Sequence, residues 1–171
     1  MPKLYIFAGL PGSGKTTLAR RLARRVNAVH LRIDTIEQAL RDLCRVQVEG
    51  EGYRLAYRIA ADNLQLDLDV VADSCNPIEL TRREWEDVAD ANGAEFVNIE
   101  VICSDTDEHR GRVESRASDV PGLRLPTWDD VENREYHDWS RDRIIIDTAQ
   151  RSVDACFDSL VGELDTAKRT P

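Results

Sequence analysis

Short apolar runs alternate with amphipathic segments along most of this chain. Residues 3–8 (KLYIFA) form an apolar run between Pro2 and Gly9, a pattern that is typical of a buried strand. Residues 14–26 then place apolar side chains at helical spacing and arginines on the opposite face, which predicts an amphipathic helix. Further strands are predicted at 29–33, 68–72, 96–103 and 143–147, and helices at 34–43, 53–66, 76–92 and from about residue 152. Strands that alternate with helices predict an α/β fold, a five-stranded parallel sheet covered by helices on both faces.

Two of these helices carry detailed signals. In the helix at 76–92, Asn76 is the predicted N-cap, Pro77 the first helical residue, and Glu79 the partner in a capping box. Asn92 and Gly93 are predicted to end this helix. The last helix is predicted to bury the apolar residues that recur along it at helical spacing. These are Val153, Cys156, Phe157, Leu160 and Leu164.

One stretch, residues 104–142, does not fit the alternation. It is polar, rich in charge and punctuated by Pro121, Gly122 and Pro126. A connection of this length in a compact domain is often a functional lid, so we predict a helical lid here and refer to it as the lid segment. The length of 171 residues otherwise suits one sizeable core, so a single domain spanning residues 1–171 is expected.

Composition and charge narrow the class of protein. The formal net charge is −9, which disfavours a nucleic-acid substrate because an acidic surface repels the phosphate backbone. No apolar run approaches the roughly 20 residues that a membrane span needs, and the run at 4–10 lacks the charged start of a signal peptide. The scattered cysteines include no CxxC pair, which indicates reduced thiols rather than a zinc or redox site. A cytoplasmic protein without a membrane partner is therefore expected.

Residues 9–16 (GLPGSGKT) match the phosphate-binding pattern G-x-x-x-x-G-K-[ST] at every fixed position. They lie between a predicted strand and a predicted helix start, where glycines let backbone N–H groups surround a phosphate. Lys15 is predicted to reach the β- and γ-phosphates as a catalytic residue, and the Thr16 hydroxyl is predicted to bind Mg²⁺. The predicted nucleotide-binding residues are Gly9, Pro11, Gly12, Ser13, Gly14, Lys15, Thr16 and Thr17. The guanine-reading sequence Asn-Lys-x-Asp is absent, which favours an ATP-dependent protein over a GTPase.

Two aspartates are expected at the carboxyl ends of strands, where ligands bind in open α/β sheets. Asp34 follows the second strand and is a candidate for the base that accepts a hydroxyl proton during phosphoryl transfer. It is also placed to cap a helix, because Asp-Thr-Ile-Glu is a capping-box pattern, and the two roles can coexist. Asp73 follows the third strand and is a candidate for the Mg²⁺ site or the acceptor, with a turn or cap residue as the alternative.

The lid segment contributes cationic candidates of its own. Arg112 and Arg116 are four residues apart, so both would face one side of a predicted helix. Arginines delivered by a mobile lid can stabilise the charge that develops on a transferring phosphoryl group, and a catalytic role is predicted for at least one arginine of the cluster that these two form with Arg110. Arg124, Arg134 and Arg141 are weaker candidates. The alternative is a solvated helix in which the arginines are balanced by Glu108 and Glu114.

Aromatic and histidine side chains are the remaining candidates. The aromatic stretch of the lid segment contains Trp128, Tyr136, His137 and Trp139. These side chains either line a substrate or pack the lid onto the body of the protein, and packing is the favoured interpretation. His30 and His109 have no apparent partner in the sequence and are expected to be structural or exposed.

Several of these pieces together resemble the small P-loop kinases, a group that includes chloramphenicol phosphotransferase, zeta toxins and the kinase domain of polynucleotide kinase. They are the phosphate-binding loop, Asp34, Asp73 within VVADSCNP, and RVESR at 112–116. The resemblance covers most of the chain. It implies a five-stranded parallel sheet, ATP, Mg²⁺ and the phosphorylation of a hydroxyl group. It also implies Lys15 and Thr16 at the phosphates and metal, Asp34 as base, and a lid arginine on the γ-phosphate.

The chain departs from two members of this group. Polynucleotide kinases place an arginine three residues after the base aspartate to hold an acceptor phosphate, and that position is Glu37 here. Arg41, one turn further on, would substitute only if the helix were rotated. Shikimate kinases have a second aspartate two residues after the position of Asp34, and Ile36 stands there, so shikimate is disfavoured as the acceptor.

The sequence thus predicts an ATP- and Mg²⁺-dependent kinase that phosphorylates a hydroxyl of a small molecule. A polynucleotide or nucleotide kinase, and a regulatory module that binds ATP without transferring phosphate, are the alternatives. Asp34, Glu37 and Asp73 would repel a phosphate, and the arginines at 20–25 are expected to point away from the crevice. A neutral or cationic alcohol is therefore the expected acceptor. No oligomeric state is predicted.

Overall fold

The structure is a computed structural model that describes residues 1–167. Its strands are β1 (Lys3–Ala8), β2 (Val29–Arg32), β3 (Val70–Asp73), β4 (Glu95–Ile102) and β5 (Ile144–Asp147). Its helices are α1 (Lys15–Val26), α2 (Ile33–Ala39), α3 (Glu51–Leu64), α4 (Glu79–Ala91), α5 (Thr106–Ser115), α6 (Trp128–Glu132) and α7 (Val153–Ala167). A π-helical segment, η1 (Leu40–Cys44), continues α2. Within these residues, no helix combines the length and the apolar character needed to cross a bilayer.

All five strands form one parallel sheet, as the alternation of strands and helices predicted. Their order is β2-β3-β1-β4-β5, so the chain crosses over between non-neighbouring strands. Because the strands are parallel, their carboxyl ends lie along one edge of the sheet, and the loops that follow them meet there. This edge holds the residues discussed below.

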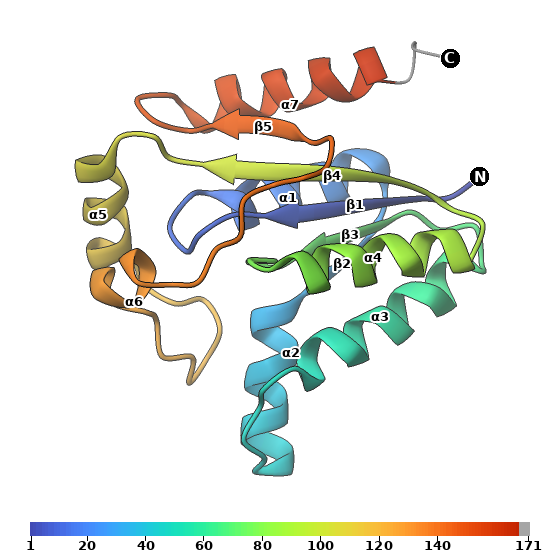
Figure 1. Cartoon of the computed structure of the whole chain (residues 1–171), viewed down its shortest axis with the longest axis horizontal. Helices are drawn as coiled ribbons and strands as arrows, with labels where there is room; N and C mark the ends of the chain where they lie inside the picture. Colours follow the sequence, from blue (N-terminus) through green and yellow to red (C-terminus); the bar gives the residue numbers. More distant parts are fainter. Residues whose placement is uncertain (168–171) are drawn as a thin grey trace.

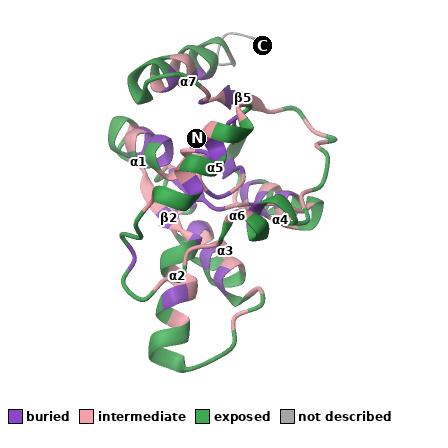
Figure 2. Cartoon of the chain, turned by 90° about the vertical axis from the view of Figure 1, so that its left-hand side faces the viewer, coloured by how far each residue is buried: buried purple, intermediate pink, exposed green. Residues whose placement is uncertain are grey.

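Helices cover both faces of the sheet, with α1 and α7 on one face and α3 and α4 on the other (Figure 1). β1 serves both layers, because its side chains point alternately to either side. Tyr5 and Phe7 pack with α1 and α7, and Leu4 and Ile6 pack with α3 and α4. Burial of each large apolar side chain contributes about 1.5–3 kcal/mol, so this central strand anchors two cores. Figure 2 shows this burial concentrated at the sheet, whereas η1, which continues α2 away from the sheet, is mostly exposed.

The predicted start of α4 is wrong. Ile78 is the N-cap, the helix begins at Glu79, and no side chain caps it. Asn76 instead has a left-handed backbone with φ of 48° and is fully buried before the helix. The buried Arg82 donates from Nε to the Asn76 carbonyl oxygen at 3.1 Å and from Nη2 to that of Pro77 at 3.0 Å. These hydrogen bonds from a helical residue use the carbonyl oxygens of Asn76 and Pro77 and keep both residues out of the helix. The local sequence at 76–79 does not reveal them, and so it predicts too early a start for α4.

The last helix buries its predicted stripe with one exception. Cys156, Leu160 and Leu164 are buried, and Phe157 packs against the same cluster. Val153 is 44% exposed, so its predicted burial is wrong. It is the first residue of α7, and the buried part of the stripe begins one turn later.

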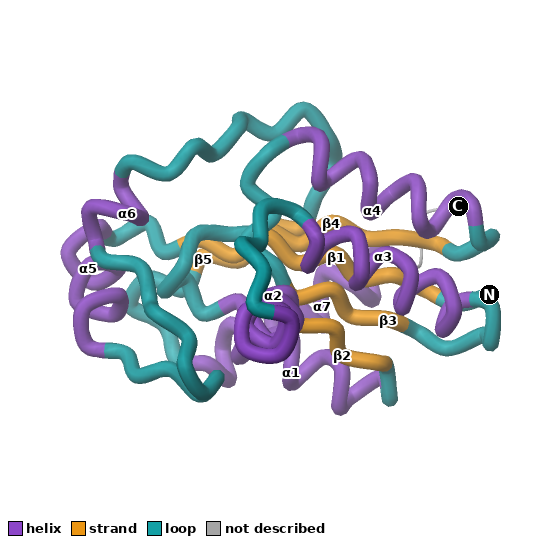
Figure 3. The backbone as a smooth tube through the Cα atoms, turned by 90° about the horizontal axis from the view of Figure 1, so that it is seen from below, coloured by secondary structure: helices purple, strands orange, loops and turns teal. Residues whose placement is uncertain are grey.

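The lid segment contains two short helices joined by irregular chain, seen at one side of the molecule in Figure 3. Arg82 ties its second half to the body, donating to the carbonyl oxygens of His137 at 3.0 Å and Asp138 at 3.2 Å. The Arg82 guanidinium also lies 4.0 Å from the ring centroid of Trp139, and the Tyr136 hydroxyl donates to a buried glutamate. These aromatic side chains therefore pack the segment onto the body, the interpretation favoured from sequence.

Candidate functional site

The phosphate-binding loop lies between β1 and α1 in a conformation that only glycine adopts readily. Gly9 and Gly12 have φ of 137° and 85°. A Cβ on Gly9 would lie 2.2 Å from the Val101 carbonyl oxygen, and one on Gly12 would lie 2.6 Å from Cγ2 of Val113 on α5. The backbone can therefore wrap tightly at the N-terminus of α1, the arrangement that exposes N–H groups to an anion.

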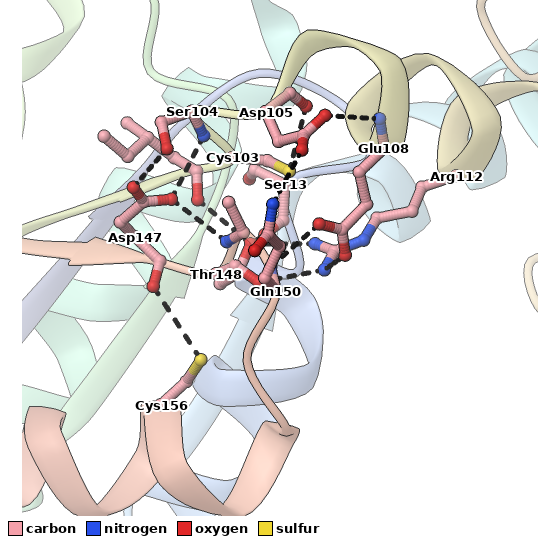
Figure 4. Close-up of polar contacts among 12 residues, drawn as sticks. Ser13, Cys103, Ser104, Asp105, Glu108, Arg112, Asp147, Thr148, Gln150 and Cys156 are labelled. Carbon is pink, nitrogen blue, oxygen red and sulfur yellow. Dashed lines mark hydrogen bonds and ion pairs between the residues drawn. The ribbon is translucent and has the colours of Figure 1, made fainter.

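A polar network supports this loop from behind (Figure 4). The Thr148 hydroxyl donates to the Ser13 carbonyl oxygen at 2.9 Å. Arg112 donates from Nη1 to that same hydroxyl at 2.8 Å and from Nη2 to the Thr148 carbonyl oxygen at 2.9 Å, and it also pairs with Glu108. Thr148 directly follows β5 and was missed by sequence reasoning, although its place at the end of a strand is a usable signal. The network joins α5, β5 and the loop.

His109 makes a second link between α5 and the loop. Its Nε2 atom lies 2.8 Å from the Pro11 carbonyl oxygen, its ring packs edge-on against Trp128, and it is only 6% exposed. His109 is therefore structural, one of the two roles expected for it, and its partner was not apparent in the sequence because the two residues are about a hundred positions apart. The start of the lid segment is thus attached to the phosphate-binding loop.

Asp73 lies at the end of β3 beside the first turn of α1. Thr16 Oγ1 donates to Asp73 Oδ1 at 3.2 Å, and His30 Nε2 lies 3.3 Å from Asp73 Oδ2, a partner that was not apparent in the sequence. Asp73 is 2% exposed, and no lysine or arginine in residues 1–167 pairs with it. A buried carboxylate beside a threonine hydroxyl suits a divalent cation that keeps most of its water and phosphate ligands. The set Thr16 and Asp73 therefore fits Mg²⁺, although residues 1–167 contain no larger cluster of metal-binding side chains.

A cavity of about 810 Å³ at this edge of the sheet brings most of the predicted site residues together. Its walls include Lys15, Thr16, Asp34, Asp73, Arg112 and Arg116, together with Pro11, Gly12, Gly14 and Thr17. Gly9 and Ser13 lie outside it, beside a smaller hollow behind the loop. Residues far apart in sequence thus share one space large enough for a nucleotide and a second small molecule.

Asp34 belongs to the first turn of α2 rather than to the end of a strand. Arg32 is the N-cap of α2, and no side chain makes a capping hydrogen bond, so the interpretation of Asp34 as a cap is wrong. The Asp34 side chain is 57% exposed, and Oδ2 lies 3.8 Å from Nη2 of Arg32. Its carboxylate is therefore available to the cavity instead of being used by the helix.

Arg116 and Arg112 differ in how far their guanidinium groups are engaged. Arg112 is held by Thr148 and Glu108, whereas Arg116, the C-cap of α5, makes no hydrogen bond or ion pair through its side chain with any residue in 1–167. Burial lowers the pKa of Arg116, with nearby Arg32 adding repulsion and Asp34 opposing the shift. Of the two predicted lid arginines, Arg116 is the one whose donors are free for a ligand.

Other arginines also line the cavity, among them two of the weaker lid candidates, Arg124 and Arg134. Arg20 was expected to point away from the crevice, but it lines the cavity and pairs with Asp119 at 2.5 Å. It lies one helical turn after Thr16, which is a signal for a shared face. The rest of this group are Arg32, Arg41, Arg124 and Arg134. The cavity therefore holds more cationic side chains than expected, because folding brings arginines of α1, η1 and the lid segment to its walls.

Comparison with known proteins adds a partial sequence match and a shared fold. The ATP-dependent protease ATPase subunit HslU of Methylobacterium radiotolerans is 36% identical over 84 residues, which cover 39% of this chain and 19% of HslU. The chain therefore spans only a small part of that relative's length.

Three solved structures share the fold over nearly the whole chain. A protein described as a kinase from Chloroflexus aurantiacus has 22% identity and a TM-score of 0.71, covering 96% of this chain and 97% of its own. The Mycobacterium tuberculosis APS kinase CysC, in complex with AMPPNP and APS, has 18% identity and a TM-score of 0.70 over 96% and 98%. A gluconokinase from Sinorhizobium meliloti has 14% identity and a TM-score of 0.69 over 98% and 94%. These likenesses show a P-loop kinase-like fold.

A match to a protein-family model shows to which family the chain belongs. Residues 4–130 match the model of the AAA_33 family, described as an AAA domain. The match includes the phosphate-binding loop, Asp34, Asp73 and both lid arginines. The chain belongs to this AAA-domain family.

Proposed function

We propose that this protein is an ATP- and Mg²⁺-dependent kinase that transfers the γ-phosphoryl group to a hydroxyl of a small molecule. The observation that carries the proposal is the shared cavity. It places the accessible Asp34 carboxylate in one space with Lys15 and the hydrogen-bonded pair of Thr16 and Asp73. A protein that only binds ATP has no need of an accessible carboxylate at this point.

In this proposal, the phosphate-binding loop and Lys15 hold the β- and γ-phosphates of ATP. Thr16 and Asp73 would hold Mg²⁺, which supplies charge neutralisation to the phosphates when bound. His30 fixes the orientation of the Asp73 carboxylate through its contact at 3.3 Å. Thr148 and Arg112 keep the loop in place from behind.

Asp34 would accept the proton of the acceptor hydroxyl as that oxygen forms its bond to the γ-phosphorus. The bond from the γ-phosphorus to the bridging oxygen breaks, and its electron pair leaves with ADP. Arg116 would stabilise the charge on the transferring group, because its donors are not used by the protein. A base of this kind contributes about 10²–10⁴-fold to a rate.

The solved structures with this fold support the choice of a small acceptor, since two of them are named as kinases of gluconate and APS. The finer resemblance to chloramphenicol phosphotransferase, zeta toxins and polynucleotide kinase agrees with phosphorylation of a hydroxyl. A polynucleotide or nucleotide kinase, and a non-catalytic ATP-binding module, remain the competing assignments.

Acceptor-dependent release of ADP separates these assignments. Wild-type protein with MgATP is assayed against a panel of small alcohols and an oligonucleotide with a 5′-hydroxyl end. We expect ADP release to rise with one class of small alcohol and to be lost in Lys15→Ala, which removes the β/γ-phosphate contact without touching the core. Nucleotide binding without stimulation by any acceptor would favour the regulatory module, and stimulation by the oligonucleotide alone would favour a polynucleotide kinase.

A further inference from the structure

The cavity that contains the proposed phosphate site collects far more positive than negative charge. Eight of the chain's 23 lysines and arginines line it, against four of its 32 aspartates and glutamates. The whole chain has a net charge of −9, so the charge of the cavity is opposite in sign to that of the molecule. Because the low-dielectric walls of a cavity focus the field of its charges, such an excess attracts anions.

Two of the four carboxylates are already neutralised by neighbouring arginines. Asp119 pairs with Arg20 at 2.5 Å and with Arg32 at 2.7 Å. Hydrogen bonds from these two arginines lower the pKa of Asp119 to about 2, so it stays charged and paired. Glu37 accepts a hydrogen bond from Arg41 at 3.2 Å. These pairs leave the excess of positive charge to the remaining arginines.

Three arginines in the cavity have guanidinium groups without a hydrogen bond or ion pair to any residue in 1–167. They are Arg116, Arg124 and Arg134. The Nε atom of Arg116 is buried without a partner, and so is that of Arg32. A buried donor without a partner is costly, so Arg116 is better satisfied when an anion joins it, whereas Arg124 and Arg134 are exposed and open to a ligand.

Arg116 and Arg134 lie near the proposed base, while Arg124 and Arg134 both lie close enough to act on the charge of Asp130. Arg134 is close enough to act on the charges of both Glu37 and Arg116, and Arg116 is close enough to Asp34 to be influenced by it. Asp34 is the proposed base, so Arg116 and Arg134 lie on the side of the cavity where the acceptor hydroxyl must sit. The ATP phosphates at Lys15 and the loop would use the other end.

We infer that the alcohol acceptor carries an oxyanion, a phosphate ester or a carboxylate, which binds to Arg134 and Arg124 while its hydroxyl faces Asp34. This inference rests on the proposed function and names the chemistry of its acceptor. A small molecule fits better than a nucleic-acid end, because a longer polyanion would leave the cavity and meet an acidic exterior. The arginine cluster thus reverses the expectation of a neutral or cationic alcohol.

A binding experiment tests the anion site without turnover. Protein saturated with MgAMPPNP, so that the phosphate-binding loop is filled, is titrated with inorganic phosphate and with glycerol 3-phosphate in a calorimeter. We expect saturable binding that weakens roughly tenfold or more in Arg134→Gln. Arg124→Gln provides a second variant should the first fail to fold. Arg110→Gln is the matched control, since Arg110 is exposed on α5, pairs with Glu114 and lies outside the cavity.

An assay of ADP release tests the acceptor chemistry. Matched pairs of alcohols that differ only in an anionic group are compared, such as glycerol with glycerol 3-phosphate and glucitol with gluconate. We expect the charged member of a pair to stimulate ADP release, and Arg134→Gln to raise KM for that acceptor with little change in KM for ATP. The phosphate and carboxylate arms identify which oxyanion the site accepts.

The two experiments distinguish failure of this inference from failure of the proposed function. Absence of saturable phosphate binding, or equal affinity in wild type and Arg134→Gln, would overturn the inference even if the protein is a kinase. A neutral alcohol used at least as well as its charged partner would do the same, and so would an oligonucleotide preferred over the charged small alcohols. Failure to bind MgAMPPNP at all would instead remove the proposed function.

Discussion

Asp34 combines an accessible carboxylate with a fixed position on the first turn of a helix. Because no capping bond uses it, its side chain is free to accept a proton from an acceptor in the cavity. Its nearest charged neighbour is Arg32, whose Nη2 atom lies 3.8 Å from Asp34 Oδ2, and Arg116 lies close enough to feel its charge. In the proposed function, this accessible carboxylate is what distinguishes a kinase from a protein that only binds ATP.

Replacement of Asp34 by asparagine tests that difference. Asp34→Asn keeps the size of the side chain but cannot accept the hydroxyl proton, so we expect phosphoryl transfer to fall by about 10²-fold or more. The affinity for MgATP should stay unchanged, as measured by calorimetry. Asp62→Asn, at an exposed position on α3, is the control and should keep full activity. Full transfer activity in Asp34→Asn would show that Asp34 is not the base.

Arg116 is expected to act in transfer more than in binding. Its free donors should engage charge that develops only as the phosphoryl group moves, so Arg116→Ala should lower kcat by about 10²-fold and leave the affinity for ATP nearly unchanged. Arg110→Ala removes an exposed arginine of the same helix that pairs with Glu114, and it should have little effect. Equal kcat values for the Arg116→Ala variant and wild type would contradict the assignment.

Among the elements, α5 and the phosphate-binding loop are held together by side-chain contacts. His109 contacts the Pro11 carbonyl oxygen, and Arg112 reaches the loop through the Thr148 hydroxyl. Gly12 faces Val113 so closely that no side chain fits between them. A shift of α5 would therefore move the loop that is proposed to bind the nucleotide phosphates.

The contact between Gly12 and α5 can be tested by adding one methyl group. Gly12→Ala places a Cβ 2.6 Å from Val113 Cγ2 on a backbone with φ of 85°, so we expect the free energy of unfolding to fall by about 1–3 kcal/mol. The affinity for ATP should fall with it. Gly111→Ala is the matched control on α5, because its Cβ meets open space and alanine favours a helix. Urea denaturation of both variants makes the comparison, and equal losses would refute it.

Sequence reasoning succeeded where the signal is local and periodic. The strand β1, the loop after it and the parallel sheet follow from apolar runs and glycine spacing that need no tertiary information. The start of α4 was misplaced because Arg82, from within the helix, holds the chain around Asn76. The charge of the cavity was misjudged because Arg134 and Arg41 reach it from elements whose orientation depends on packing.

For the whole molecule, an acidic exterior surrounds a cationic cavity. The net charge of −9 limits attraction of long polyanions, while the arginines of the lid segment and α2 concentrate positive charge where a small anion can reach Asp34. Most of the predicted residues of a phosphoryl-transfer site share this one space. Whether the protein is a kinase therefore depends on where the γ-phosphoryl group goes.

The most direct measurement follows that group with ATP labelled at the γ-phosphate. Wild type is incubated with MgATP and the anionic alcohols, and the products are separated into inorganic phosphate and organic phosphate esters. The account predicts label in an organic ester, formed in equal amount to ADP and nearly abolished in Asp34→Asn but kept in Asp62→Asn. Label that appears only as inorganic phosphate with every acceptor, at the same rate in Asp34→Asn, would contradict the assignment of this protein as a kinase.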